Sequence, residues 1–374
     1  MNREDISTLR TLAIALVRSK LTYAQEFFFS APKSELKKLQ SIYCRAFKLA
    51  SGVPFHTNNL NTYNEIKILP LDFNRQAQAS KFIIKTKSFN TSCISEINIT
   101  SNKSFAKRGI NIHSITPIRS FTNLIFHQLG FDEIEVSTNN FIPTIPYWSL
   151  LKPKYDLNYE ELNKSIPPYL LKTKVLEHIY NKYNNHIKIY TDGSKLDNEQ
   201  TGAAYYNQTY RQAKSFYIGK FYSIFTAELV GIQQATNHII TNNITNQDIL
   251  FCIDSKSVIT SLQSNNNKNR PSLIYQIQLA FHNILSNNKS LSILWTPSHC
   301  DISGNEIADK EAKKGATNSI TSSKINIALD SHEHFYLINK TISNNVLNLH
   351  KTLNNSYSKT CVLYTKSLNP TKSK

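Results

Sequence analysis

The stretch IKIYTDGSK, residues 187–195, decides the fold of the second half of the chain. Its apolar residues Ile187 and Ile189 alternate with lysine and tyrosine, which is the two-residue period of a β-strand. Asp-Gly follows at residues 192–193, a pair typical of a tight turn. We therefore predict a strand that runs into a turn and holds the carboxylate of Asp192 where the backbone turns away.

Strands and helices alternate after this first strand. We predict, in order, strands at 202–207 and 211–218, a helix at 223–240, a strand at 249–254, a short helix at 255–262, a helix at 271–285, a strand at 291–295 and a last helix that begins at its N-cap, Asn305. This order predicts an α/β fold with a mixed five-stranded sheet flanked by helices.

The N-terminal flank has a different character. Residues 1–100 read as a mainly helical region, and its second helix, between Pro32 and Gly52, has a basic outer face. That face holds Lys33, Lys37, Lys38, Arg45 and Lys48. A solvated helix face is the ordinary interpretation, and the charge of the whole chain favours the alternative that the face contacts phosphates.

Two further flanking regions are less regular. Residues 101–184 read as a connecting region with many prolines and a basic segment at 101–119, ending in a helix at 171–183. Residues 318–374 read as a polar C-terminal extension with one helix at 332–353 and a disordered end at 366–374. We therefore expect four regions, with residues 185–317 as the α/β domain.

Composition and charge narrow the class of function. Hydrophobic residues make up 40% and charged residues 18% of the chain, as in folded proteins. The net charge of +17 indicates a polyanionic partner, either nucleic acid or an anionic membrane. We expect no membrane span, because no apolar run approaches the roughly 18–20 residues that a span needs.

The cysteines and the distribution of charge refine this expectation. The five cysteines are scattered without zinc-finger spacing, so we expect reduced thiols and an intracellular protein of the cytoplasm or nucleus. Residues 186–317 hold 12 Lys and Arg against 10 Asp and Glu, so the flanks carry +15 of the +17. We expect these basic flanks to supply salt-sensitive affinity for a nucleic-acid backbone.

Four acids lie where the predicted fold can bring them together. Asp192 and Asp254 each end an apolar strand, Glu228 lies one turn into its helix, and Asp309 lies one turn into the last helix. Each has an ordinary explanation: a turn residue for Asp192, a helix cap for Asp254, a partner of the helix dipole for Glu228 and an ion pair with Lys313 for Asp309.

Converging carboxylates repel one another unless a cation lies among them, so together the four acids predict two divalent ions, with Mg²⁺ suited to hard oxygen ligands. Two ions about 3.5–4 Å apart are a standard arrangement for phosphodiester displacement.

Four motifs then give a specific resemblance. YTDGSK, FTAELVGIQQA, FCIDSKSV and WTPSHCDISGNEIADKEAKKGA, in this order and spacing, resemble the type 1 ribonuclease H domain, and most of all the version in non-LTR retrotransposon polyproteins. The resemblance covers residues 187–316 and implies a ribonuclease H-like fold. Residues 12–54 are similar to the thumb-like segment that follows the palm of non-LTR reverse transcriptases. The polymerase YxDD motif is missing from the sequence, so we expect the C-terminal part of a larger retroelement protein that does not copy nucleic acid by itself.

The resemblance implies roles for the acids and for one histidine. Asp192 would bridge both ions, Glu228 and Asp254 would complete the shell of the second ion, and Asp309 would help to hold the water-activating ion. His299 matches the family's auxiliary histidine, which assists proton transfer or product release.

Three more positions bear on the last loop and helix. Glu306 matches the glutamate of the family's GNE segment, near the same metal. The family usually has glycine two positions after the histidine, and this chain has Asp301, which we expect to stiffen the loop or slow turnover without removing a metal ligand. We expect Trp295 to belong to the core rather than to stack on a base.

The resemblance implies an endoribonuclease that hydrolyses the RNA strand of RNA–DNA hybrids with Mg²⁺, or with Mn²⁺ as the alternative, by a two-metal mechanism. Discrimination would rest on the RNA 2′-hydroxyls, with the backbone near Gly193 and Glu228 as candidates to contact them. The competing hypothesis is a catalytically weakened nucleic-acid-binding remnant of a retrotransposon protein. A third hypothesis is a 3′–5′ exonuclease on a related fold. That family has a second acid two residues after the first, and this chain has Ser194 there.

Overall fold

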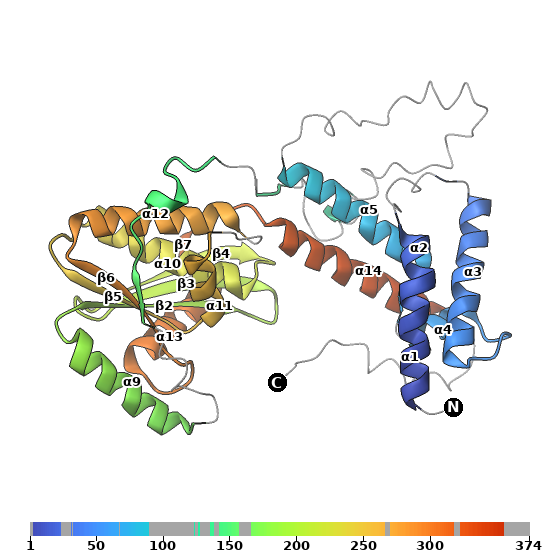
Figure 1. Ribbon diagram of the computed structural model, residues 1–374, viewed down its shortest axis with the longest axis horizontal. Coiled ribbons are helices and arrows are strands. Elements are labelled where there is room, and N and C mark those ends of the chain that lie inside the picture. The colour runs from blue at the N-terminus through green and yellow to red at the C-terminus, as the bar shows by residue number, and fades with distance from the viewer. Residues whose placement is uncertain are drawn as a thin grey trace, which may run out of the picture. The chain divides into compact units, whose positions relative to one another are not determined.

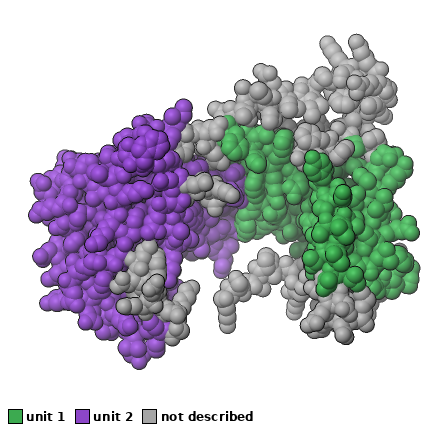
Figure 2. All heavy atoms as spheres, in the orientation of Figure 1, with its two compact units in different colours: residues 1–136, 334–374 green, residues 137–333 purple. Residues whose placement is uncertain are grey.

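The computed structural model describes residues 3–23, 31, 33–66, 68–89, 123, 126–127, 135–137, 142–156, 166–265, 270–317 and 322–354. The chain splits into two compact units, one of residues 1–136 with 334–374 and one of residues 137–333 (Figure 2). The basic segment at 101–119 and the end at 366–374 lie outside the described residues. The division into four regions stays a prediction.

The unit of residues 137–333 is built on one mixed sheet (Figure 1). Its strands are β1 (Lys154–Asp156), β2 (Ile187–Lys195), β3 (Gln200–Asn207), β4 (Gln212–Lys220), β5 (Asp248–Ile253), β6 (Ser290–Trp295) and β7 (Ser323–Lys324), in the order β1-β6-β5-β2-β3-β4-β7. The β2–β3 and β3–β4 pairs are antiparallel and the others are parallel. The predicted α/β fold with a mixed sheet is confirmed, and two short edge strands, β1 and β7, extend the five that were predicted.

Helices cover both faces of this sheet. They are α9 (Pro168–Tyr183), α10 (Ile224–Thr241), α11 (Lys256–Gln263), α12 (Pro271–Asn287) and α13 (Ser303–Thr317), and a 3₁₀ turn lies at Tyr147–Ser149. The helices α10 and α12 lie over one face and α13 over the other (Figure 1). The central strands are buried on both faces, which explains the continuous apolar run at 249–253.

Two of the predicted boundaries that differ from the structure concern the candidate site. The strand β2 does not turn at Gly193; it pairs with β3 as far as Lys195. The helix α13 begins at Ser303, so Asn305 lies inside the first turn instead of capping it. At both positions, a residue type that usually favours a turn or a helix N-cap makes a contact with another element of the fold instead.

The other unit is mainly helical. Its elements are α1 (Arg3–Ala13), a π-helix (Ile14–Arg18), α2 (Ser19–Thr22), α3 (Lys33–Ser51), α4 (Asn59–Ile66), α5 (Leu71–Ser88) and α14 (Ser331–Asn354) from residue 334 onward. Tyr43, Phe47 and Tyr63 belong to its buried core. Lys48 does not belong to the basic outer face, because it is 5% exposed and donates a hydrogen bond of 2.9 Å to the carbonyl oxygen of Phe55. None of the helices in the described part of the chain is long and apolar enough to cross a membrane.

Candidate active site

The carboxylate of Asp192 projects from the middle of the sheet. The strand β2 pairs with β5 on one side and β3 on the other, so its backbone is fixed from both sides. Asp192 is only 6% exposed, and the backbone N–H of Gly193 donates a hydrogen bond of 2.7 Å to its Oδ1. The strand therefore holds one buried carboxylate in a defined orientation.

Gly193 allows the helix α10 to come close to this strand. A Cβ atom at position 193 would lie 2.5 Å from the backbone nitrogen of Glu228 and 2.7 Å from the Cβ of Ala227. Only a residue without a side chain fits such a close approach of two backbones. The Asp-Gly pair in this chain therefore marks helix–strand contact and not a turn.

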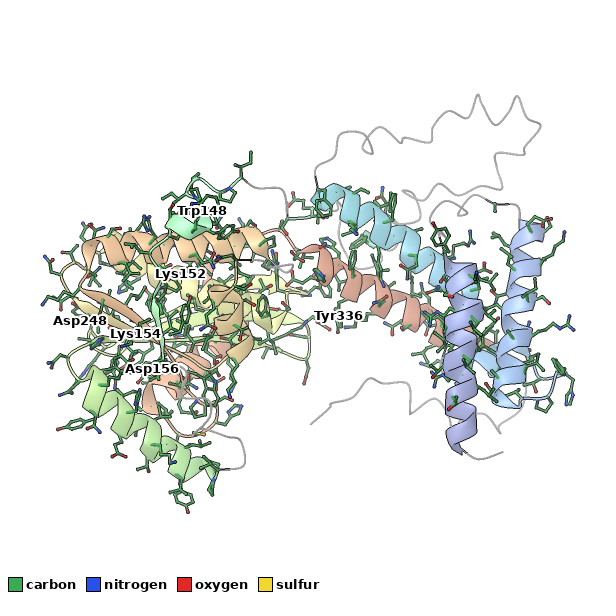
Figure 3. All side chains as sticks on the ribbon, viewed as in Figure 1. Trp148, Lys152, Lys154, Asp156, Asp248 and Tyr336 are labelled. Carbon is green, nitrogen blue, oxygen red and sulfur yellow. The ribbon has the colours of Figure 1, made fainter. Side chains whose placement is uncertain are left out.

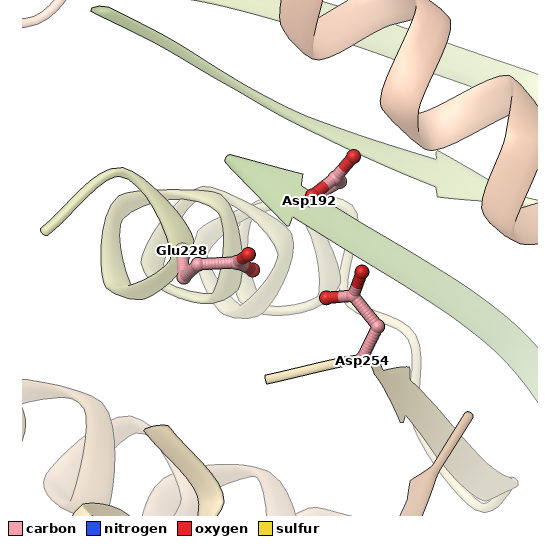
Figure 4. A group of neighbouring side chains, drawn as sticks. All are labelled: Asp192, Glu228 and Asp254. Carbon is pink, nitrogen blue, oxygen red and sulfur yellow. The ribbon is translucent and has the colours of Figure 1, made fainter. Parts of the chain in front are cut away.

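Three of the four predicted acids meet at this contact (Figure 4). Asp192 comes from β2, Glu228 from the first turns of α10, and Asp254 directly follows β5. One carboxylate oxygen from each residue lies within 4.8 Å of the others. Asp254 does not cap α11, since Ser255 occupies the N-cap position. The structure thus brings together three acids that are far apart in the sequence.

Burial, and after it the charges of nearby acids, raises the pKa values of all three acids. Burial, and then the charge of Asp254, raises the pKa of Asp192 to about 8, against the lowering effect of the Gly193 N–H. Burial and the other two acids raise the pKa of Glu228 well above its ordinary value. Burial raises the pKa of Asp254 to about 6, although the nearby His299 lowers it. Each of these shifts opposes the charged form of the cluster, so a bound cation would stabilise it.

Two buried oxygens of the cluster and one beside it have no hydrogen-bond partner among the described residues. Glu228 Oε2, Asp254 Oδ1 and Asn305 Oδ1 are buried without a hydrogen bond in the part of the chain that the structure describes. A buried polar atom without a partner is costly, and carboxylate and amide oxygens are the hard ligands that Mg²⁺ and Mn²⁺ prefer. The residues present therefore fit a divalent cation.

Asp309 lies beside the cluster and is not one of its three members. Its carboxylate forms an ion pair of 2.5 Å with Lys313 Nζ, one turn further along α13. Its charge also raises the pKa values of Asp192 and Asp254, so it lies close enough to interact with both. The ordinary explanation of an i,i+4 pair thus holds for Asp309, and its role as a metal ligand stays a prediction.

His299 lies on the exposed loop between β6 and α13. Its backbone is left-handed, with φ of 56°, and so is that of Asp301, with φ of 54°. The buried side chain of Cys300 lies between these two exposed residues and anchors the loop. His299 is close enough to lower the pKa of Asp254, while Glu306 lies half-buried in the first turn of α13. The auxiliary role of His299 stays a prediction.

Two residues support the cluster in ways that were not predicted. Asn305 is 3% exposed, and its side chain lowers the pKa of Asp254. Trp295 is buried, and its Nε1 donates a hydrogen bond of 2.9 Å to the carbonyl oxygen of Asp254. A strong N-cap preference concealed the role of Asn305, and nothing in the apolar character of Trp295 indicates its hydrogen bond.

A known protein family matches this part of the chain. The family model described as RNase H covers the strands β2 to β6, the helices between them and α13. Residues 184–317 match RNase H. The RNase H segment contains Asp192, Glu228, Asp254, Asp309 and His299, and its fold is RNase H-like. No curated protein sequence matches the chain.

Two solved structures are similar to the RNase H segment. RNase H1 from the halophilic archaeon Halobacterium salinarum NRC-1 is 18% identical with a TM-score of 0.28, over 35% of this chain and 96% of its own. LC11-RNase H1 in complex with RNA/DNA hybrid is 18% identical with a TM-score of 0.28, over 34% of this chain and 97% of its own. The retroelement context of the chain stays a prediction.

Proposed function

We propose that the chain is a divalent-metal-dependent endoribonuclease of type 1 ribonuclease H that hydrolyses the RNA strand of RNA–DNA hybrids. The observation that carries this proposal is the buried cluster of Asp192, Glu228 and Asp254 within the segment that matches RNase H. A protein that only binds nucleic acid has no evident use for three buried acids, because they repel one another and also repel the polyanionic ligand. Their combined cost is understandable if they hold cations that act on a phosphodiester.

Asp192, Glu228, Asp254 and Asp309 would hold a pair of Mg²⁺ ions, or of Mn²⁺ ions. When bound, such ions lower the pKa of a coordinated water and neutralise charge on the leaving oxygen. The chain orients the ligands: the N–H of Gly193 fixes Asp192, and the end of β5 presents Asp254. Asp309 would leave its pair with Lys313 to take part, and the exposed His299 would exchange a proton with solvent or assist product release.

Discrimination between RNA and DNA would rest on the 2′-hydroxyl of the cut strand. Glu228 is the candidate side chain for that contact, because it is the member of the cluster that comes from α10. The backbone near Gly193 is the other candidate, because it lies at the close contact between β2 and α10. Bases would not be read, so cleavage is expected to be largely independent of sequence.

The flanks would supply affinity and context. The net charge of residues 186–317 is only +2 of the +17, which supports basic flanks as the source of contacts to the nucleic-acid backbone. The helical region before the RNase H segment is compatible with a thumb-like element of a retrotransposon reverse transcriptase. We include this context in the proposal on the strength of the sequence resemblance at residues 12–54.

A cleavage assay with the full chain tests the proposed function. A hybrid labelled on its RNA strand, the matching RNA duplex and the matching DNA duplex are incubated with the protein and Mg²⁺. We expect cleavage of the RNA strand of the hybrid alone, with 3′-hydroxyl and 5′-phosphate ends, and we expect Asp192→Asn to abolish it while hybrid binding persists. Binding without cleavage by the native chain would instead support the weakened remnant, and normal turnover by Asp192→Asn would refute the site.

A further inference from the structure

A segment beyond the RNase H match folds back onto the RNase H-like domain. Residues 322–333, here called the strap, belong to the same compact unit, and β7 within them pairs with the edge strand β4. The strap is anchored along its length, since Tyr222 donates to the carbonyl oxygen of Ile327 and Ser137 N–H donates to that of Leu329 at 2.9 Å. Leu329 is 5% exposed. The strap is therefore packed against the domain as part of the same compact unit.

The strap ends on the N-terminus of α10, the helix that carries Glu228. Ser223 is the N-cap of this helix, and its hydroxyl accepts a hydrogen bond of 3.1 Å from the backbone N–H of Thr226. One oxygen of Glu333, Oε1, accepts hydrogen bonds from the Ser223 N–H at 2.8 Å and from the Thr226 hydroxyl at 2.7 Å. The strap thus adds a second, negatively charged cap to the helix, where a negative charge is favourable.

A buried arginine holds this carboxylate in place. The other oxygen of Glu333, Oε2, pairs with the guanidinium of Arg270 and accepts the Asp330 N–H at 2.9 Å. The side chains of Arg270 and Glu333 are 5% and 6% exposed. Arg270 Nε also donates to the hydroxyl of Thr226 at 3.1 Å. The network therefore joins the strap, the start of α12 and the start of α10.

We propose that Glu333 is a positioning residue of the active site, which acts through α10 on Glu228. Glu228 lies five residues after Ser223, and its backbone nitrogen lies so close to β2 that Gly193 has no room for a Cβ. A helix start that shifts would therefore displace Glu228 from Asp192. This inference rests on the proposed function, but the main quantity that tests it is the increase of Tm on adding Mg²⁺.

A matched control separates positioning from simple stabilisation. Asp156 of β1 is also a buried acid in a network: it accepts hydrogen bonds from His178 Nε2 at 2.8 Å and Lys182 Nζ at 2.6 Å. It lies at the opposite edge of the sheet from β7, on a strand that β6 and β5 separate from β2 (labelled in Figure 3). Asp156→Ala is therefore expected to lower Tm without changing the cluster.

The experiment compares the native full chain with Glu333→Ala and Asp156→Ala. Two quantities are measured: the increase of Tm on adding Mg²⁺, and the Mg²⁺ concentration that gives half-maximal hybrid cleavage. Both variants are expected to have a lower Tm without metal. Only Glu333→Ala is expected to lose most of the Mg²⁺-induced increase and to need on the order of tenfold more Mg²⁺. Equal responses of the two variants to Mg²⁺ would overturn the proposal.

Two further variants keep the test decisive. If Glu333→Ala fails to fold, Glu333→Gln, which retains an acceptor oxygen, takes its place in the same comparison. The double variant Arg270→Met with Glu333→Met removes the buried charges together, so it is expected to recover Tm but not the Mg²⁺ response. Recovery of both by the double variant would show that an unpaired charge, and not the lost cap, caused the defect. A chain that never cleaves hybrid, yet shows these differences in Tm, would refute the proposed function and leave the positioning role standing.

Discussion

The burial of Asp192, Glu228 and Asp254, together with repulsion from neighbouring acids, predicts a particular pH dependence of stability. Their pKa values are raised in the folded protein, to about 8 for Asp192 and about 6 for Asp254, so the folded state binds protons more tightly than the unfolded state. This stabilisation is present at low pH and is lost as the pH rises from about 4 to about 8.

The measurement is urea unfolding of the metal-free chain at pH 5 and pH 8. We expect the native protein to lose at least about 1 kcal/mol more than Asp192→Asn between these two pH values, because the variant removes one of the raised groups. Saturating Mg²⁺ should reduce the loss in the native protein. An equal loss in both proteins would mean that the pKa of Asp192 is not raised in the folded protein.

Asp301 gives a second prediction for a single residue. Its φ of 54° is left-handed, a conformation that glycine adopts freely, that aspartate tolerates and that β-branched residues avoid. We expect Asp301→Gly to change the free energy of unfolding by less than about 1 kcal/mol and to retain cleavage. Asp301→Val should cost about 1–2 kcal/mol more. If urea unfolding gives the same stability for both variants, the loop that carries His299 is not held in this conformation.

Single residues also show where sequence reasoning succeeds and fails. The positions of Asp192 and Asp254 directly after two apolar runs were sufficient to predict that these acids converge, because β2 and β5 are parallel neighbours and Thr191 pairs with Ile253. The cap formed by Glu333 was not predictable, since its partners lie more than 100 residues earlier in the chain. Asn305 was predicted as an N-cap because asparagine is favoured at that position, whereas in the structure its side chain interacts with Asp254.

The packing of α10 on β2 leads to a prediction about elements. A Cβ at position 193 would lie 2.5 Å from the backbone nitrogen of Glu228, so Gly193→Ala must push the helix away from the strand. We expect this change to cost about 1–3 kcal/mol in urea unfolding and to weaken the Mg²⁺-induced rise in Tm, because Glu228 moves with its helix. Unchanged stability would contradict the close contact.

The elements that were missed share a physical cause. The strands β1 and β7 have only 3 and 2 residues, too few for an alternating pattern to emerge. Their place in the sheet is set by tertiary contacts, such as those of Asp156 with α9 and of the strap with β4. The long strands and helices, whose periodic patterns are strong, were predicted to within a few residues.

At the scale of the whole molecule, the uneven charge predicts how the chain binds hybrid. Lys37, Lys38 and Arg45 on α3 are exposed, whereas Lys48 is buried and should be left unchanged. We expect the triple change of the three exposed residues to glutamine to reduce the slope of log affinity against log salt by up to about 2 to 3, with turnover at low salt retained. A slope that stays the same would exclude this helix as a contact surface.

The most direct test of the central claim is a calorimetric titration of the full chain with Mn²⁺ at pH 8. The native protein is compared with Asp192→Asn and with Asp248→Asn, a control at the opposite end of β5 from Asp254 (labelled in Figure 3). We predict that the native protein and the control bind Mn²⁺ alike, and that Asp192→Asn loses that binding. Equal binding by all three proteins, or none by the native protein, would contradict a metal site at Asp192, Glu228 and Asp254.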